Sequence, residues 1–194
     1  MSILLHKVLK NSYHPKPDAF KGYTFDNELS NHNQQVYYNP NEKDNKKLLY
    51  SVTGTHNLKD WGTSLYGALG MIKKTNRYKE AKDTLTKAKQ KYNTNNATIS
   101  GHSLGGQISG YIGNKDDKVL TLDKAASPFQ KMRSNENSYR SKGDIVSLLN
   151  ANSKRTKTIG DKQYINPLKA HDVDNIKDSN IYIYINCIVI HLII

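Results

Sequence analysis

The sequence predicts an α/β fold in which a central, mostly parallel sheet is flanked by helices, in a compact and minimal version. Short runs of β-branched and large apolar residues alternate with longer stretches whose apolar residues recur at helical spacing. Segment 97–106, ATISGHSLGG, joins one such run to a helical pattern through a very short turn. This alternation is typical of parallel sheets, because each crossover between parallel strands needs a helix-sized connection.

Length and charge limit the class of protein. The chain has 194 residues, enough for one domain with a substantial core. Its formal net charge of +12 favours anionic partners, and peripheral contact with an anionic membrane surface fits this charge. The lysines are spread over 43–47, 73–91 and 154–162 without the pattern of a nucleic-acid-binding module. We therefore expect solvated helix faces and no nucleic acid partner.

The cysteine content and the ends of the chain indicate a location and a domain plan. With Cys187 as the single cysteine, no disulfide forms within the chain, which favours a reducing, intracellular setting, cytoplasmic or peripheral to a membrane. The first residues hold too short an apolar run for a signal peptide. Segment 181–194 is shorter than the roughly 20 residues of a membrane helix and is predicted to be an apolar tail or strand. Residues 1–35 are expected to form an N-terminal extension packed on an α/β domain over 36–180.

The first half of the chain contains two predicted strands and three predicted helices. A short helix over 4–11 precedes a loop with two prolines, which exclude regular structure there. Strands are predicted at 36–38 and 48–52. Apolar stripes then predict one helix over 61–72 and a second over 78–92, the second with lysines on its solvent face.

The second half continues the alternation of strands and helices. Its apolar runs are short and bounded by glycine, asparagine and aspartate, which end strands and helices. The predicted elements are a strand before Gly101, a helix over 104–112, a strand at 119–122, a loop over 124–143, a strand over 144–149, a hairpin region over 157–162, and a loop carrying His171.

Segment 101–105 has the pattern G-x-S-x-G of the nucleophile elbow of α/β-hydrolases. The serine of such an elbow, here Ser103, occupies a strained apex so that its hydroxyl projects above the sheet. Side chains at Gly101 and Gly105 would collide where strand and helix close around that apex, so only glycine fits. The turn also directs the first helical amides, starting with Leu104, toward a reacting carbonyl. Ser103 is therefore the predicted nucleophile.

A serine hydroxyl needs a base, and the base needs an orienting acid. In α/β-hydrolases these residues follow in the order serine, acid, histidine. Only His171 and His191 come after Ser103, and His191 lies within the apolar tail, so His171 is the predicted base. His102 is expected to pack or hydrogen-bond instead, because a direct neighbour cannot easily turn its ring to the Ser103 hydroxyl.

Six acidic residues lie between Ser103 and His171. They are Asp116, Asp117, Asp123, Glu136, Asp144 and Asp161. The first two precede a predicted strand, at the wrong edge of a parallel sheet, while Glu136 and Asp161 are expected to be solvated in polar loops. Asp123 ends a predicted strand at the correct edge. Asp144 adjoins apolar residues that could shield its bond to the histidine. The residues alone leave Asp123 and Asp144 as equal candidates.

The oxyanion hole needs a second donor besides the Leu104 amide. The turn after predicted strand 48–52 contains Gly54 and Thr55, whose N–H and hydroxyl groups could point at the carbonyl oxygen. Each such donor contributes about 3 kcal/mol to transition-state stabilisation. The alternative is an ordinary turn that caps the following helix.

Three separated segments make the chain similar to the class 3 (fungal-type) lipases. They are VTGT at 52–55 with Trp61 downstream, GHSLGG at 101–106, and DIV at 144–146 before the histidine. Together they span about residues 47–175. In the family an arginine usually precedes the Gly-Thr pair, whereas this chain has Thr53.

This resemblance implies specific roles for residues of the chain. Ser103 is the implied nucleophile, Asp144 the acid and His171 the base, so the resemblance selects Asp144 over Asp123. It further implies Thr55 and Leu104 as oxyanion donors and Trp61 as a substrate-binding residue.

The expected activity is hydrolysis of carboxylic esters of lipids through an acyl-enzyme, without a cofactor or a metal. Two alternatives stay open at this point. One is an acyltransferase that uses the same residues, and the other is a non-catalytic lipid-binding protein of the same fold.

Overall fold

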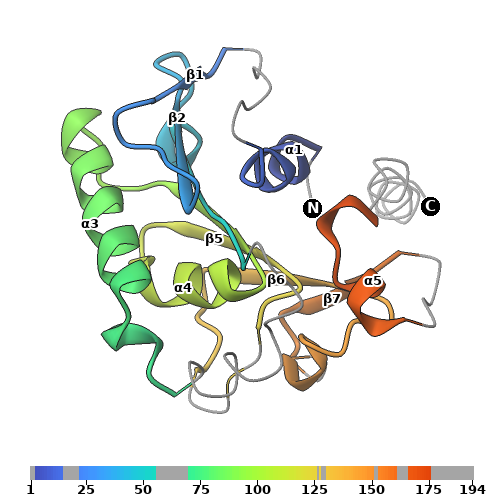
Figure 1. Ribbon diagram of the computed structural model, residues 1–194. Coiled ribbons are helices and arrows are strands. Elements are labelled where there is room, and N and C mark those ends of the chain that lie inside the picture. Colours follow the sequence, from blue (N-terminus) through green and yellow to red (C-terminus); the bar gives the residue numbers. More distant parts are fainter. Residues whose placement is uncertain are drawn as a thin grey trace, which may run out of the picture.

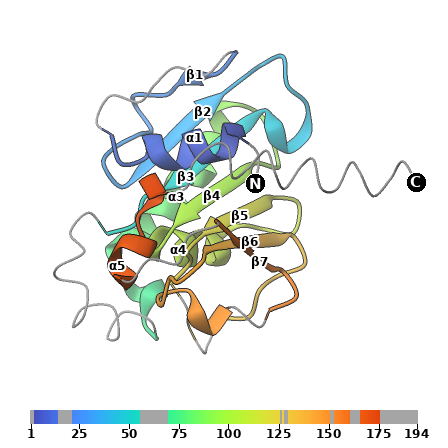
Figure 2. The same ribbon diagram turned by 90° about the vertical axis from the view of Figure 1, so that its right-hand side faces the viewer.

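The computed structural model describes residues 3–14, 22–55, 70–125, 127, 130–150, 153–160 and 166–175. The seven strands within these residues form one sheet. Their order in space follows their order in the chain (Figures 1 and 2). The strands are β1 Thr24–Phe25, β2 Gln34–Tyr38, β3 Leu48–Val52, β4 Thr98–His102, β5 Lys118–Leu122, β6 Glu136–Ser141 and β7 Thr156–Ile159. The pairs from β3 to β7 are parallel, while β1 and β2 are antiparallel to their neighbours. The predicted mostly parallel sheet is confirmed.

Helices cover both faces of this sheet (Figures 1 and 2). Helix α1, Ile3–Asn11, lies on one face, and helices α3, Asn76–Lys91, and α4, Leu104–Ile112, lie on the other. Among the described residues, no helix has the length and apolar character needed to cross a membrane. The shorter helices are η1 Asp44–Lys46, η3 Ile72–Lys74, η4 Leu148–Asn150, α5 Pro167–Ala170 and η5 Val173–Asn175.

The core has a layer on each side of the sheet. Tyr50 and Ile99 are fully buried in the larger layer, where Leu85 of α3 and Ile108 of α4 pack against them. On the α1 side, Leu9 packs in a second cluster with the apolar residues of β5. Burial of a large apolar side chain contributes about 1.5–3 kcal/mol, so these two layers fix the helices on the sheet.

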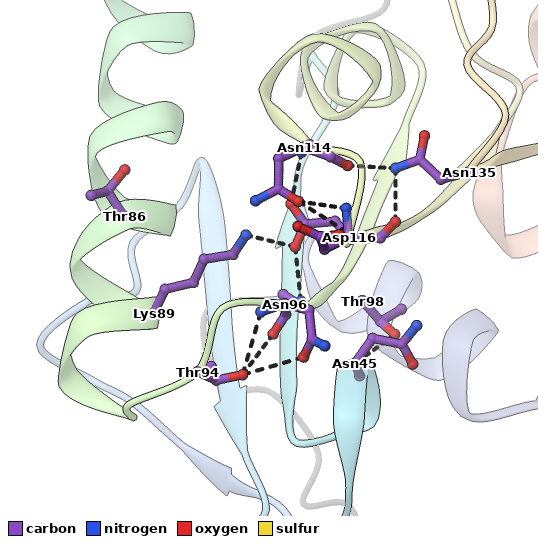
Figure 3. A network of polar contacts seen from close by, with 12 residues as sticks. Asn45, Thr86, Lys89, Thr94, Asn96, Thr98, Asn114, Asp116 and Asn135 are labelled. Atoms are coloured by element: carbon purple, nitrogen blue, oxygen red, sulfur yellow. Dashed lines mark hydrogen bonds and ion pairs between the residues drawn. The ribbon is translucent and has the colours of Figure 1, made fainter.

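A network of polar contacts that includes Lys89, Asn114 and Asn135 lies at the amino edge of the parallel strands (Figure 3). Asp117 precedes β5, and its carboxylate accepts hydrogen bonds from Lys89 of α3 and from the backbone N–H groups of Ala97 and Asn114. Asn135 then donates to the carbonyl oxygens of Asn114 and Asp117. This network ties the starts of β4, β5 and β6 together, at the edge opposite the glycine-containing turn that follows β4.

The predicted loop over 124–143 is wrong, because β6 occupies Glu136–Ser141. This strand carries almost no apolar residues, and the pattern of a buried strand is therefore absent from its sequence. Glu136 was expected to be solvated, but it is fully buried and pairs with the equally buried Lys124 at 2.5 Å. The partner that makes this burial tolerable comes from another strand end, which a local pattern does not reveal.

The predicted strand over 144–149 is also wrong. The chain turns at Gly143, whose φ is 90°, and then forms a bend and η4. The Asp144 carboxylate accepts hydrogen bonds from the N–H groups of Val146 and Ser147, and such local bonds compete with strand pairing. The expected hairpin over 157–162 is instead β7, which runs parallel to β6.

Two predicted elements lie outside the described residues, wholly or in large part. The apolar segment 181–194 is not described, and neither are residues 61–69 of the predicted helix over 61–72. The end of that predicted helix falls in η3, where Ile72 is buried in the larger core layer.

Candidate active site

Ser103 stands between β4 and α4 in a conformation that few non-glycine residues adopt. Its φ is 55° and its ψ is −123°, and it is 1% exposed. A Cβ atom at Gly101 would overlap the carbonyl oxygen of Gly105, and a Cβ atom at Gly105 would overlap the carbonyl oxygen of Val52. The two glycines are therefore required by close backbone contacts, as the pattern of a nucleophile elbow predicts.

The structure brings together the three residues that the resemblance selects. The His171 ring lies 2.7 Å from the Ser103 hydroxyl through Nε2 and 2.9 Å from Asp144 Oδ1 through Nδ1. All three side chains are buried. Ser103 lies in the elbow, Asp144 in the turn after β6 and His171 directly after α5. The three residues therefore meet at the carboxyl edge of the parallel strands, where functional sites of α/β sheets are found.

The carboxylate of Asp144 is held by four hydrogen bonds. Besides His171, it accepts the N–H groups of Val146 and Ser147 and the Ser147 hydroxyl. Burial by itself raises the pKa of Asp144, but the bonds from His171 and Ser147 outweigh burial and lower the pKa below its ordinary value. Asp144 is therefore ionised, as a group that orients and stabilises an imidazolium must be.

Asp123, the competing acid, has a different environment. It lies at the end of β5 with a φ of 45°, and its two oxygens meet the N–H and the hydroxyl of Ser141 at 2.5 and 2.7 Å. Burial and repulsion from Asp144 raise its pKa well above the ordinary value. Burial thus favours the neutral form of Asp123, whereas Asp144 is the carboxylate bonded to His171.

His102 makes hydrogen bonds on both ring nitrogens, as expected of a structural residue. Nε2 lies 2.8 Å from the carbonyl oxygen of His171, and Nδ1 lies 2.5 Å from the hydroxyl of Tyr13. Burial and the neighbouring His171 lower the pKa of His102 to about 3, so its ring is neutral. In the neutral ring one nitrogen donates and the other accepts, so Nε2–H donates to the carbonyl and Nδ1 accepts from Tyr13.

Turn 53–55 (Thr53, Gly54 and Thr55) packs directly against the elbow. A Cβ atom at Gly54 would lie 2.9 Å from the carbonyl oxygen of His102 and 3.1 Å from Ser103 Cβ. Thr55, the next residue, is half-buried, and Leu104 opens α4, where its N–H has no intrahelical acceptor. Trp61, the predicted substrate-binding residue, lies outside the described residues.

Tyr13 is a site residue that the sequence does not reveal. It follows α1, and its hydroxyl reaches both His102 and the N–H of Gly54, at 3.0 Å from the latter. Its ring also meets the His102 ring edge-on at a centroid distance of 5.6 Å. The contact joins residues 89 positions apart, and no motif around Tyr13 indicates it.

One group of potential metal ligands occurs among the described residues. His102, Asp123 and His171 place ligand-type atoms within 4.8 Å of one another. The ring nitrogens and carboxylate oxygens of these residues already have hydrogen-bond partners within the protein. A metal bound there would have to displace the bonds that hold the Ser103–His171–Asp144 arrangement together.

Sheet, elbow and the serine–histidine–acid arrangement together are the features of an α/β-hydrolase fold. By sequence, the chain matches no family model and no curated protein. By structure, it is similar to the native Rhizomucor miehei lipase–propeptide complex, with a TM-score of 0.52 and 14% identity, over 81% of this chain and 67% of that chain. The Lip2 lipase of Yarrowia lipolytica aligns with a TM-score of 0.43 and 16% identity, over 89% and 81% of the two chains. The mostly parallel sheet and the similarity to the Rhizomucor miehei lipase, whose TM-score exceeds 0.5, assign the α/β-hydrolase fold to the chain.

Proposed function

We propose that the chain is a serine hydrolase that cleaves carboxylic esters, with Ser103 as nucleophile, His171 as base and Asp144 as orienting acid. One observation carries the proposal: the His171 ring bridges a strained serine and an ionised, buried carboxylate at 2.7 and 2.9 Å. In this geometry Asp144 fixes the proton of His171 on Nδ1, which leaves Nε2 free to accept the proton of the serine hydroxyl.

The reaction follows from these positions. As Ser103 Oγ attacks the ester carbonyl carbon, the proton of the serine hydroxyl passes to His171 Nε2. The carbonyl carbon becomes tetrahedral, and the electron pair of the C=O π bond moves to the carbonyl oxygen, which becomes an oxyanion. The N–H groups of Leu104 and Thr55 stabilise that oxyanion, each by about 3 kcal/mol. His171 then protonates the departing alcohol, which leaves an acyl-enzyme. Water activated by His171 releases the acid and restores the serine hydroxyl.

We propose a lipid ester as the substrate class. The GHSLGG segment and the similarity in fold to the Rhizomucor miehei lipase support this choice. The net charge of +12 favours an anionic lipid surface as the place where the substrate is met.

A fluorophosphonate probe tests the proposal, because it reacts covalently with activated serines. We expect the wild-type chain to be labelled on Ser103, and we expect Ser103→Ala to abolish labelling and ester hydrolysis without loss of folded structure. Hydrolysis of p-nitrophenyl esters of short and long chain length, compared with a phospholipid, then defines the substrate. A folded wild-type chain that is neither labelled nor active on any of these esters would contradict the proposal.

A further inference from the structure

Arg77 lies in the first turn of helix α3. Among the described residues, its guanidinium donates hydrogen bonds to turn 53–55 alone. Its Nη2 donates to the carbonyl oxygen of Thr53 at 2.6 Å, and its Nη1 donates to the carbonyl oxygen of Gly54 at 3.3 Å. Among the described residues, no carboxylate forms an ion pair with Arg77. A partly buried cation is usually paired with a carboxylate. The position of a guanidinium that binds two successive carbonyl oxygens therefore needs another explanation.

The two carbonyls belong to consecutive peptide planes. In a trans peptide the C=O of one residue and the N–H of the next point in opposite directions. The plane that holds the Thr53 carbonyl also holds the Gly54 N–H, which donates to Tyr13. The next plane holds the Gly54 carbonyl and the Thr55 N–H, for which the described residues supply no acceptor. Arg77 therefore fixes the direction of the Thr55 N–H from the opposite end of its own peptide group.

The same bond also changes the strength of the donor. When a carbonyl accepts a charge-assisted hydrogen bond, the peptide group is polarised and its N–H becomes a better donor. Burial lowers the pKa of Arg77, but a guanidinium stays protonated in proteins. The fixed charge thus acts on the Thr55 N–H at all working pH values.

Tyr13 holds the turn from its other side. Its hydroxyl accepts the Gly54 N–H and donates to His102, whose Nε2–H donates to the carbonyl of His171. Thr53 is anchored as well, because its N–H donates to Asn33 and its hydroxyl donates to the carbonyl of Ser12. Among the described residues, the N–H and carbonyl groups of both Thr53 and Gly54 therefore have hydrogen-bond partners, whereas the Thr55 N–H has none.

We infer that Arg77 is a positioning residue for the oxyanion donor: its guanidinium orients and polarises the Gly54–Thr55 peptide group so that the Thr55 N–H binds the oxyanion. Tyr13 is the second positioning residue, acting on the preceding peptide group. This inference rests on the proposed function, because it assigns the Thr55 N–H a role in that reaction. Interactions of this kind act in the transition state and leave binding of the ground-state ester unchanged.

The test is Arg77→Met, with kcat and KM measured for a short-chain p-nitrophenyl ester and the inhibition constant measured for a phenylboronic acid. Its tetrahedral serine adduct places an oxygen where the oxyanion forms. Removal of an oxyanion donor lowers kcat by a factor of about 10²–10³, and a donor that is present but less well oriented lowers it less. We therefore expect kcat of Arg77→Met to fall roughly 10- to 100-fold with KM unchanged. The inhibition constant of the boronic acid should rise by the same factor as kcat/KM falls.

Lys79→Met is the matched control, because Lys79 is exposed on the same helix and the variant loses the same charge. Arg77→Lys keeps the charge but cannot fork to two carbonyls, so we expect an intermediate loss from a chain that retains its fold. Wild-type kcat in either Arg77 variant, or an unchanged affinity for the boronic acid, would overturn the inference. Such a result would leave the proposed function intact, whereas an inactive, unlabelled wild-type chain would remove that function itself.

Discussion

The two acids that the sequence leaves equal can be separated by one matched pair of substitutions, Asp144→Asn and Asp123→Asn. Asparagine at 144 keeps the shape of the side chain but presents an amide to His171 Nδ1, which favours the wrong tautomer of the ring. The corresponding change in a serine protease triad costs about 10⁴ in kcat, or about 5.5 kcal/mol of transition-state stabilisation. We expect a loss of that order for Asp144→Asn.

Asp123→Asn should behave differently. The raised pKa of Asp123 favours the neutral carboxyl group, whose charge asparagine shares. The amide oxygen of asparagine can accept the Ser141 N–H, and its amide N–H can donate to the Ser141 hydroxyl oxygen. We expect kcat within about threefold of the wild type, since no charge bonded to His171 is lost. The assay is kcat for p-nitrophenyl butyrate, with a fluorophosphonate labelling rate as a second measure. An equal loss in the two variants, or a greater loss in Asp123→Asn, would refute the assignment of Asp144 as the acid.

Further predictions concern stability, measured as the urea midpoint. Ser103→Gly should be about 1 kcal/mol more stable than Ser103→Ala, because glycine relieves the strain of a φ of 55° and both variants lose the hydroxyl; equal midpoints would contradict this. Gly105→Ala should cost about 3 kcal/mol, because its Cβ would overlap a carbonyl oxygen of β3, and a near-neutral midpoint would count against that contact. The raised pKa of Asp123 means that the folded chain holds a proton that the unfolded chain loses above about pH 4, so wild-type stability falls as pH rises from there. Asp123→Asn should therefore gain on the wild type between pH 4 and pH 8, and a constant difference over that range would disprove the shift. Lys124→Met alone should cost about 3–5 kcal/mol by leaving Glu136 buried and unpaired, and adding Glu136→Leu should recover most of the loss.

The sequence predicts the elements whose apolar residues follow a regular spacing. Strand β3 over 48–52, the helices near 76–91 and 104–112, and the sheet class all follow from local patterns. Strand β6 does not, because its buried residues are polar or charged, and the buried Glu136 is paired with Lys124 from outside the strand. Asp144 likewise lies in a turn, since its carboxylate bonds to the next N–H groups and ends the strand before it.

The site divides in the same way. The elbow is readable because its glycines and serine are adjacent in the chain and each has a steric reason. The roles of Tyr13 and Arg77 are not readable, because their contacts with turn 53–55 depend on how α1 and α3 pack on the sheet. In sequence, Arg77 is one more basic residue at the start of a lysine-rich helix. Class 3 lipases usually have an arginine at the position of Thr53. In this chain the guanidinium at that turn belongs to Arg77 of α3 instead.

The ends of the described chain meet beside the site. Lys10 of α1 pairs with Asp174 at 3.0 Å, and Leu9 packs with Val173 in one apolar cluster. Tyr13 is synthesised well before the elbow and His171 well after it, and the site is complete only when both have docked. Because Ser103 precedes His171 in the chain, a growing chain would contain the proposed nucleophile before the proposed base, and we expect the serine to stay unactivated until His171 docks. For the same reason, we expect mild denaturant to abolish hydrolysis before the sheet itself unfolds.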